Sequence, residues 1–84
     1  MRITFDRDTG QRTAVDGERL RGLRRSMGLS LASVAATTGL ALATISALET
    51  ESMSPSTASI EKLQKIYGAA LRESGAITVT QAAP

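Results

Sequence analysis

The stretch that decides the fold is GLSLASVAATTGLALATISALETESMSPS, residues 28–56. It predicts two short helices, one from residue 31 to about 38 and one over roughly 41–50. Ser30 can cap the first of them, because a serine hydroxyl accepts a hydrogen bond from a free N–H group of the first turn. Gly39 ends that helix, since glycine adopts the left-handed conformation at which helices commonly stop. The stretch therefore describes two helices joined by a sharp turn.

The apolar side chains of this stretch give each of the two helices an inner face. Val34 and Ala35 face inward from the first helix, and Ile45 and Leu48 form the buried pair of the second. Ala35 is small, so the two helices can approach closely. With Ile45 and Leu48 anchored, the opposite face of the second helix is free. This is the pattern of a helix-turn-helix, whose second helix can enter the major groove of DNA.

Three further helices are expected around this pair. Asp16 is a good N-cap for a helix that Gly28 ends, and Ser56 caps a fourth helix after the loop at residues 51–55. A short fifth helix spans residues 69–74. The chain is therefore expected to contain five helices.

Both ends of the chain alternate polar and apolar residues, as half-buried strands do. Residues 2–5 and 11–15 flank turn-forming residues and predict a hairpin. Residues 76–80 predict another strand, whose partner is one of the two hairpin strands. We expect a small sheet that joins the two ends of the chain, within one subunit or across a dimer, and a frayed tail at residues 81–84.

The expected fold class is mainly α: a five-helix helix-turn-helix domain with an N-terminal β-hairpin and a short C-terminal β-strand. The 84 residues are enough for one domain. Its expected parts are the N-terminal hairpin or arm at residues 1–15, the helix-turn-helix DNA-binding domain at 16–75, and the C-terminal strand and tail at 76–84.

Composition argues against several classes of function. The chain has no cysteine and no histidine, the ligands that zinc sites and iron–sulfur clusters need, and we expect no metal and no cofactor. The acidic residues are scattered at termini and turns, so nothing converges on a catalytic site and we do not expect an enzyme. No apolar run approaches the roughly 18 residues of a membrane span, and the N-terminus lacks the apolar segment of a signal peptide. We expect a cytoplasmic protein without a membrane partner.

Positive charge is concentrated at the two ends of the chain. Residues 1–25 hold seven arginines and four acidic residues, a net charge of +3. Residues 26–59 hold no lysine or arginine and two glutamates, a net charge of −2. Residues 60–84 hold three cations and two acidic residues, a net charge of +1. The middle segment, which contains the predicted second helix of the motif, is therefore the least basic.

A series of short residue groups follows one another without an insertion: Gly17-Glu18-Arg19-Leu20-Arg21, Leu23-Arg24-Arg25, Gly28-Leu29-Ser30, Val34-Ala35, Thr38-Gly39-Leu40, Thr44-Ile45-Ser46, Leu48-Glu49, Pro55-Ser56 and Leu63. With these residues at this spacing, the chain resembles the Xre/Cro family of phage-repressor-like DNA-binding domains. The hairpin and the last strand are not part of the family's core pattern.

The resemblance implies roles for three sets of residues. Arg24 and Glu49 match a buried ion pair that locks the first helix to the recognition helix, and each lies on an apolar face where a lone charge is costly. The residues that the recognition helix presents to DNA bases are Ala41, Leu42, Ala43, Thr44, Ser46 and Ala47. The residues expected at phosphates, partly through backbone N–H groups at helix N-termini, are Ser30, Leu31, Thr50 and Ser56, with Arg19 and Arg21 as further candidates.

The sequence departs from the family pattern where DNA is read. Leu31 replaces the usual glutamine, and Glu51 stands where the family prefers glycine, adding a negative charge near the expected DNA backbone. The recognition face is small and apolar, so residues 41–47 offer no bidentate readout of guanine or adenine. Specificity is then expected from DNA shape, from water, or from arginines of the N-terminal arm. The arm candidates are Arg2, Arg7 and Arg12.

Two functional hypotheses follow. The first is a sequence-specific double-stranded DNA-binding transcriptional regulator, a repressor of its own operon on a phage or other mobile element. It would bind an inverted-repeat operator as a homodimer, because one such domain is too small to bind a half-site tightly. The residues expected at the dimer surface are Leu71, Ile77 and Val79. The second is a protein-interaction module on the same fold, such as an antitoxin subunit, favoured by the absence of lysine and arginine from residues 26–59.

Overall fold

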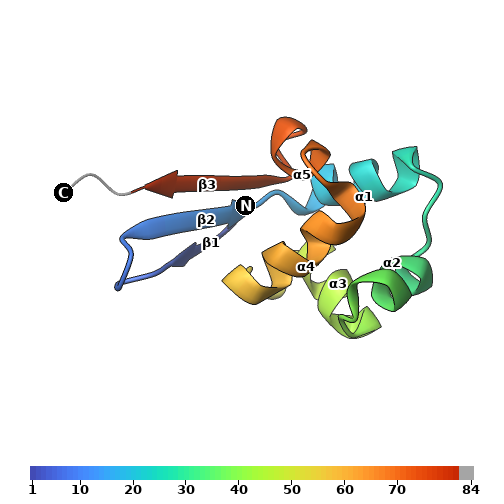
Figure 1. Cartoon of the computed structure of the whole chain (residues 1–84), viewed down its shortest axis with the longest axis horizontal. Coiled ribbons are helices and arrows are strands. Elements are labelled where there is room, and N and C mark those ends of the chain that lie inside the picture. Colours follow the sequence, from blue (N-terminus) through green and yellow to red (C-terminus); the bar gives the residue numbers. More distant parts are fainter. Residues whose placement is uncertain (82–84) are drawn as a thin grey trace.

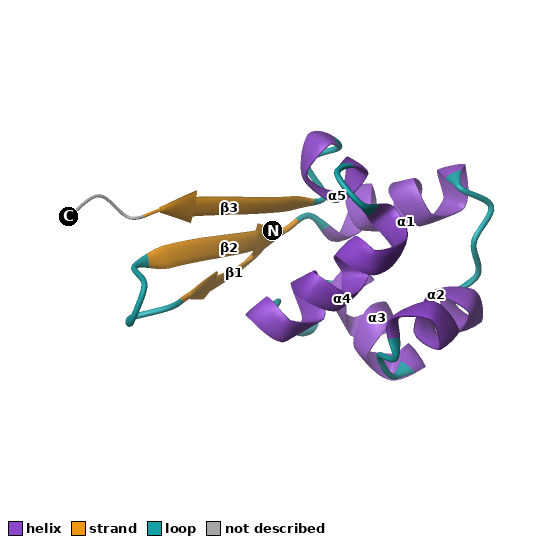
Figure 2. Ribbon diagram, in the orientation of Figure 1, coloured by secondary structure: helices purple, strands orange, loops and turns teal. Residues whose placement is uncertain are grey.

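The computed structural model describes residues 1–81 and confirms the expected fold class, with five helices and a three-stranded antiparallel sheet within those residues. The helices form one body, and the strands project from one end of it (Figure 1 and Figure 2). The tail expected at residues 81–84 lies, beyond Gln81, outside the described residues. The elements follow the chain in the order β1 (Arg2–Phe5), β2 (Gln11–Val15), α1 (Gly17–Ser26), α2 (Leu31–Thr38), α3 (Leu42–Glu49), α4 (Thr57–Tyr67), α5 (Ala70–Glu73) and β3 (Ile77–Gln81).

Polar side chains begin three of the helices, as the sequence predicts. At α1, the Asp16 carboxylate accepts a hydrogen bond of 3.2 Å from the N–H group three residues further on. At α2, Ser30 Oγ accepts from the Ser33 N–H, and Ser33 Oγ accepts in return from the Ser30 N–H. Ser56 caps α4 through the same reciprocal arrangement. Each of these side chains satisfies an N–H group that the helix itself leaves without a partner.

Gly39 makes the turn between α2 and α3. Its φ of +78° lies in the left-handed region that glycine adopts without strain. The two helices are bent by 118° across this turn, within the roughly 90–120° of helix-turn-helix motifs. In residues 1–81 no helix taken singly is long and apolar enough to span a membrane, and α2 and α3 meet that measure only as this bent pair.

The central strand of the sheet is β2, which pairs antiparallel with β1 on one side and with β3 on the other. Val15 at its inner end lies opposite both Arg2 and Ile77. The Asp16 N–H group continues the pairing by donating to Ala76 O at 2.9 Å. The last strand therefore pairs with the return strand of the hairpin, and the sheet joins the two ends of one subunit.

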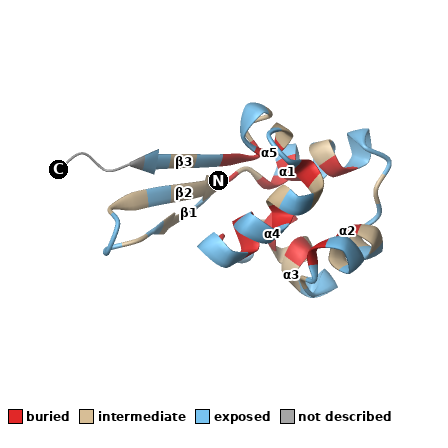
Figure 3. Ribbon diagram, in the orientation of Figure 1, coloured by how far each residue is buried: buried red, intermediate tan, exposed pale blue. Residues whose placement is uncertain are grey.

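The core lies between the helices and reaches the inner end of the sheet (Figure 3). Its side chains are almost all aliphatic: Val15, Leu20, Val34, Ile45, Leu48, Ile60, Leu63, Tyr67, Leu71, Ala76 and Ile77. This burial corrects the expected dimer surface. Leu71 and Ile77 are 0% and 1% exposed, so their side chains pack inside one subunit and leave no area for a second copy. Val79, the third residue of that prediction, is half-buried.

Tyr67 lies in this core with its hydroxyl group away from solvent. Its Oη atom has no hydrogen-bond partner among the described residues. Burial, followed by the negative charge of Glu49, raises the pKa of Tyr67 from 10.0 to about 12. The unfolded chain ionises at the lower value. The stability that this pKa shift contributes is therefore present below pH 10 and is lost as the pH rises toward 12.

We expect Tyr67→Phe to keep the free energy of unfolding at pH 7 within about 1 kcal/mol of the parent, because no hydrogen bond to the described residues is lost. Above pH 10 the variant should lose less stability than the parent, since it has no phenol to ionise on unfolding at this position. Urea denaturation at pH 7, 10 and 11 measures both effects. An equal alkaline loss in the two proteins would contradict the assignment to Tyr67.

Candidate nucleic-acid interface

The second helix of the motif, α3, is anchored on one side and open on the other. Ile45 and Leu48 are each 1% exposed and pack in the core. Leu42 is 48% exposed, and the other residues expected at bases are exposed (Ala41 and Ala43) or half-buried (Thr44, Ser46 and Ala47). The structure thus places the six expected residues around the N-terminal turn of α3 and along its open side, where solvent reaches them.

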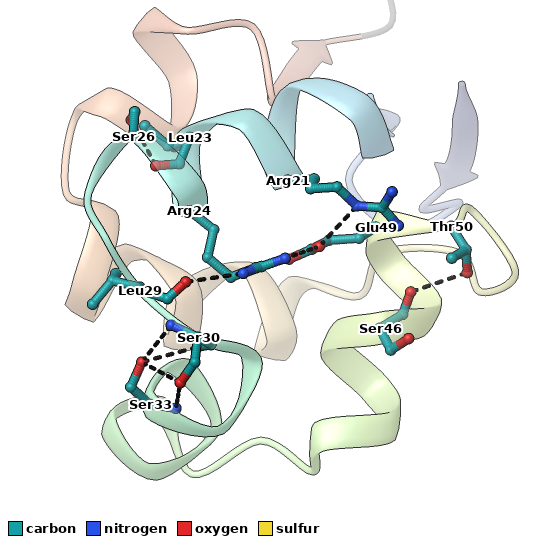
Figure 4. A network of polar contacts seen from close by, with 10 residues as sticks. All are labelled: Arg21, Leu23, Arg24, Ser26, Leu29, Ser30, Ser33, Ser46, Glu49 and Thr50. Atoms are coloured by element: carbon teal, nitrogen blue, oxygen red, sulfur yellow. Dashed lines mark hydrogen bonds and ion pairs between the residues drawn. The ribbon is translucent and has the colours of Figure 1, made fainter.

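A buried ion pair fixes the position of α3 against α1 (Figure 4). Arg24 Nε donates to Glu49 Oε2 at 2.7 Å, and Arg24 Nη2 donates to Glu49 Oε1 at 3.0 Å. Its Nη1 atom donates to the carbonyl oxygen of Leu29 at 2.9 Å, immediately before α2. The hydrogen bond to Glu49 raises the pKa of Arg24 above its already high ordinary value. One guanidinium therefore holds α1, the entry to α2 and the end of α3 together.

Arg21 extends this network toward the surface. Its Nε atom lies 3.5 Å from Glu49 Oε1, and its side chain is 44% exposed. Glu49 is the last residue of α3, so Arg21 sits beside the end of the recognition helix with its side chain partly open to solvent. Arg19 is placed differently: it donates to the carbonyl oxygen of Ser74 at 3.1 Å and lies 3.4 Å from Asp16. Of the two arginines, Arg21 is the better placed for a phosphate near α3.

The hydroxyl groups expected at phosphates already have partners within the subunit. Ser30 and Ser56 use theirs in the capping boxes of α2 and α4. Thr50 Oγ1 donates to the Ser46 carbonyl oxygen at 3.0 Å. Leu31 is half-buried and offers only its backbone N–H group. The Ser30 and Ser56 N–H groups are bonded within the same boxes, so anion contacts here would come through N–H groups of the following first turns, such as that of Leu31. Thr50 lies at the C-terminal end of α3, where its N–H donates to the Ser46 carbonyl oxygen at 2.9 Å.

Glu51 turns its charge toward the start of α1. Its φ of +60° lies in the left-handed region, which explains in physical terms why glycine suits this position. Its carboxylate accepts a hydrogen bond of 3.0 Å from the Gly17 N–H and pairs with the Met1 ammonium group. These two groups lower the pKa of Glu51. The negative charge expected to face the DNA backbone is instead compensated within the subunit, through a contact that no local sequence pattern indicates.

The three arm arginines are spread along the hairpin. Arg2 donates from Nε to Ser54 Oγ at 3.1 Å, which places it beside the loop that follows α3. Arg12 lies over the Phe5 ring, with its guanidinium carbon 5.8 Å from the ring centre. Arg7 is exposed in the turn between β1 and β2, and this turn points away from the helices (Figure 1). The structure therefore does not bring Arg7 or Arg12 together with α3.

Comparison with known proteins agrees with this geometry. Residues 20–81 match the family model described as helix-turn-helix. Over 57 residues, 68% of this chain, the sequence is 39% identical to the HTH-type transcriptional regulator PuuR of Escherichia coli (strain K12), with the same values for PuuR of Shigella flexneri. The chain spans 31% of the length of these relatives. No solved structure matches it.

Proposed function

The chain belongs to the helix-turn-helix family, and on that basis we propose that it is a dimeric repressor of its own operon, on a phage or other mobile element, that binds an inverted repeat in double-stranded DNA. The observation that carries the proposal is α3 itself. Ile45 and Leu48 anchor one side, the Arg24–Glu49 pair fixes its end, and the other side is open. The names of the two relatives, both transcriptional regulators, support the regulatory role.

The open side of α3 suits several contacts with DNA bases, each of which is weak. Ala43, Ala47 and Leu42 can touch thymine methyl groups, and Thr44 and Ser46 can each make a single hydrogen bond to a base edge. None of these side chains forms the two parallel hydrogen bonds that distinguish guanine or adenine. Specificity from one half-site is then low, which favours binding by two copies and a contribution from DNA shape.

Ala43→Glu should weaken binding to the upstream DNA of the protein's own gene by about tenfold or more, because it places a negative charge on the face that approaches phosphates. The fold should survive, since an acidic residue is favourable in the first turn of a helix. Ala69→Glu is the matched control: the same change at an exposed alanine before α5 should leave affinity within about twofold. A gel shift measures both, and equal affinities for the two variants would contradict the use of α3.

Arg21→Ala should reduce the slope of log K against log salt by about 1, the value of one phosphate contact. Arg12→Ala removes the same charge from the outer face of the hairpin and should leave the slope unchanged. Fluorescence anisotropy from 50 to 200 mM salt gives the two slopes. If Arg12→Ala lowers the slope and Arg21→Ala does not, the phosphate contacts come from the arm and not from α1.

A second candidate function rests on the same face. Leu42 is 48% exposed, and the surrounding segment of residues 26–59 has no lysine or arginine, so α3 also suits a groove on another protein, as in an antitoxin subunit. The gel shift separates the two. Retention that depends on DNA sequence supports the regulator, and no retention even at low salt supports the interaction module.

A further inference from the structure

The edge strand β1 exposes apolar side chains. It is the outermost strand on its side of the sheet, since the order is β1-β2-β3. Ile3 is 58% exposed and Phe5 is 52% exposed, and both lie on the same face because they are two residues apart. An exposed apolar edge strand is a ready template for pairing with another chain, which proteins normally block with charge, proline or a covering segment.

The backbone of β1 offers hydrogen-bonding groups at the same positions. The Asp6 N–H donates to the Gln11 carbonyl oxygen at 2.8 Å, so Asp6 is directed toward β2. Residues of a strand alternate in direction, and the Thr4 and Arg2 backbone groups therefore also point toward β2. It follows that the N–H and C=O groups of Ile3 and Phe5 point outward from the free edge.

We propose that β1 pairs antiparallel with β1 of a second copy of this chain, about a two-fold axis at Thr4. In this register Ile3 of each copy lies opposite Phe5 of the other, and their outward N–H and C=O groups form the hydrogen-bonded pairs. The two three-stranded sheets become one sheet of six strands. Because the helices lie at one end of each sheet (Figure 2), antiparallel pairing places the two helical bodies at opposite ends.

Charge complementarity favours this register and this edge. Arg2 of each copy comes to lie opposite Asp6 of the other, in a non-hydrogen-bonded pair where side chains are closest. Arg2 uses only Nε in its bond to Ser54, and Asp6 uses Oδ1 to accept from the Asp8 N–H. The other free edge, β3, has the sequence ITVTQ, with no charged side chain to select a register. Its Ile77 is buried within the subunit.

The pairing of β1 rests on the homodimer of the proposed function, and it gives that dimer a contact surface in place of Leu71 and Ile77. It also assigns Arg2 to the contact between subunits and not to DNA. Since dimerisation is measured without DNA, its outcome is independent of whether α3 reads an operator.

The first test reverses the charges across the proposed contact. Arg2→Glu places two acidic residues opposite each other, and Asp6→Lys places two basic ones, at two symmetric positions per dimer. Each should raise the dimer dissociation constant by about tenfold or more, and the double variant should restore it to within about threefold of the parent. Sedimentation equilibrium without DNA measures this. A monomeric parent, or single variants that dimerise like the parent, would overturn the proposal.

The second test uses the absence of cysteine from the chain. Thr4→Cys puts two sulfur atoms at the two-fold axis, and mild oxidation should give a covalent dimer. Thr78→Cys is the control for a dimer that pairs through β3 in place of β1. It should stay monomeric on a denaturing gel, because β3 is not the proposed contact. Cross-linking of Thr78→Cys in place of Thr4→Cys would assign the dimer to β3. If Thr4→Cys cross-links and Thr78→Cys does not, while Ala43→Glu leaves the gel shift unchanged, the dimer stands and the DNA-binding proposal fails.

Discussion

Replacing Arg24 with alanine should lower the free energy of unfolding by about 3–5 kcal/mol, because it leaves the Glu49 carboxylate buried without its bidentate partner. Glu49 is 5% exposed, and its remaining cation, Arg21, lies 3.5 Å away in a poorer geometry. Such a loss is a large fraction of the roughly 5–15 kcal/mol that stabilises a typical domain. The Leu29 carbonyl oxygen also loses its donor, so the entry to α2 should loosen with the end of α3.

Urea denaturation measures the effect, and a double substitution supplies the control. Arg24→Met together with Glu49→Leu removes both charges and keeps apolar volume, so it should be less destabilising than Arg24→Ala alone. The coupling between the two positions should appear as a non-additive term of at least about 1 kcal/mol in a double-mutant cycle. Small, additive losses would mean that solvent screens the pair and that it does not hold α3 in place.

Local rules predict most of the fold. Ser30 and Ser56 cap helices because a hydroxyl group accepts a hydrogen bond from an N–H group a few residues away. Gly39 allows the turn because glycine itself adopts the left-handed conformation without strain. These effects act between residues a few positions apart, so the sequence alone predicts where the helices begin and end. The family match over residues 20–81 confirms the helix-turn-helix that these residues indicate.

Some contacts between distant segments carry no local signal in the sequence. Leu71 and Ile77 have the composition of a dimer surface, but their burial depends on β3 packing beside β2 at the inner end of the sheet. The carboxylate of Glu51 accepts a hydrogen bond from the Gly17 N–H, 34 positions away in the sequence. The residues around either position do not indicate this contact. Apolar character alone does not tell whether a side chain meets its own subunit or another.

Gly17→Ala is the second change with a large expected effect. A Cβ atom at this position would lie 2.1 Å from the carbonyl oxygen of Glu49, and a backbone atom cannot move aside as a flexible side chain does. The start of α1 and the end of α3 would have to separate, and the Gly17 N–H bond to Glu51 would lengthen. We expect a loss of about 3 kcal/mol in the free energy of unfolding, at the upper end of overpacking effects.

Gly22→Ala tests the same change five positions further along the same helix. Gly22 is exposed, and a Cβ atom there would meet nothing within 4 Å. Alanine reduces the entropy that a helical glycine loses on folding, so this variant should gain about 0.5–1 kcal/mol. Thermal denaturation of the two variants should therefore show shifts of opposite sign. A gain at both positions would mean that α1 and α3 do not approach closely at Gly17, and the placement of the recognition helix would then have to be revised.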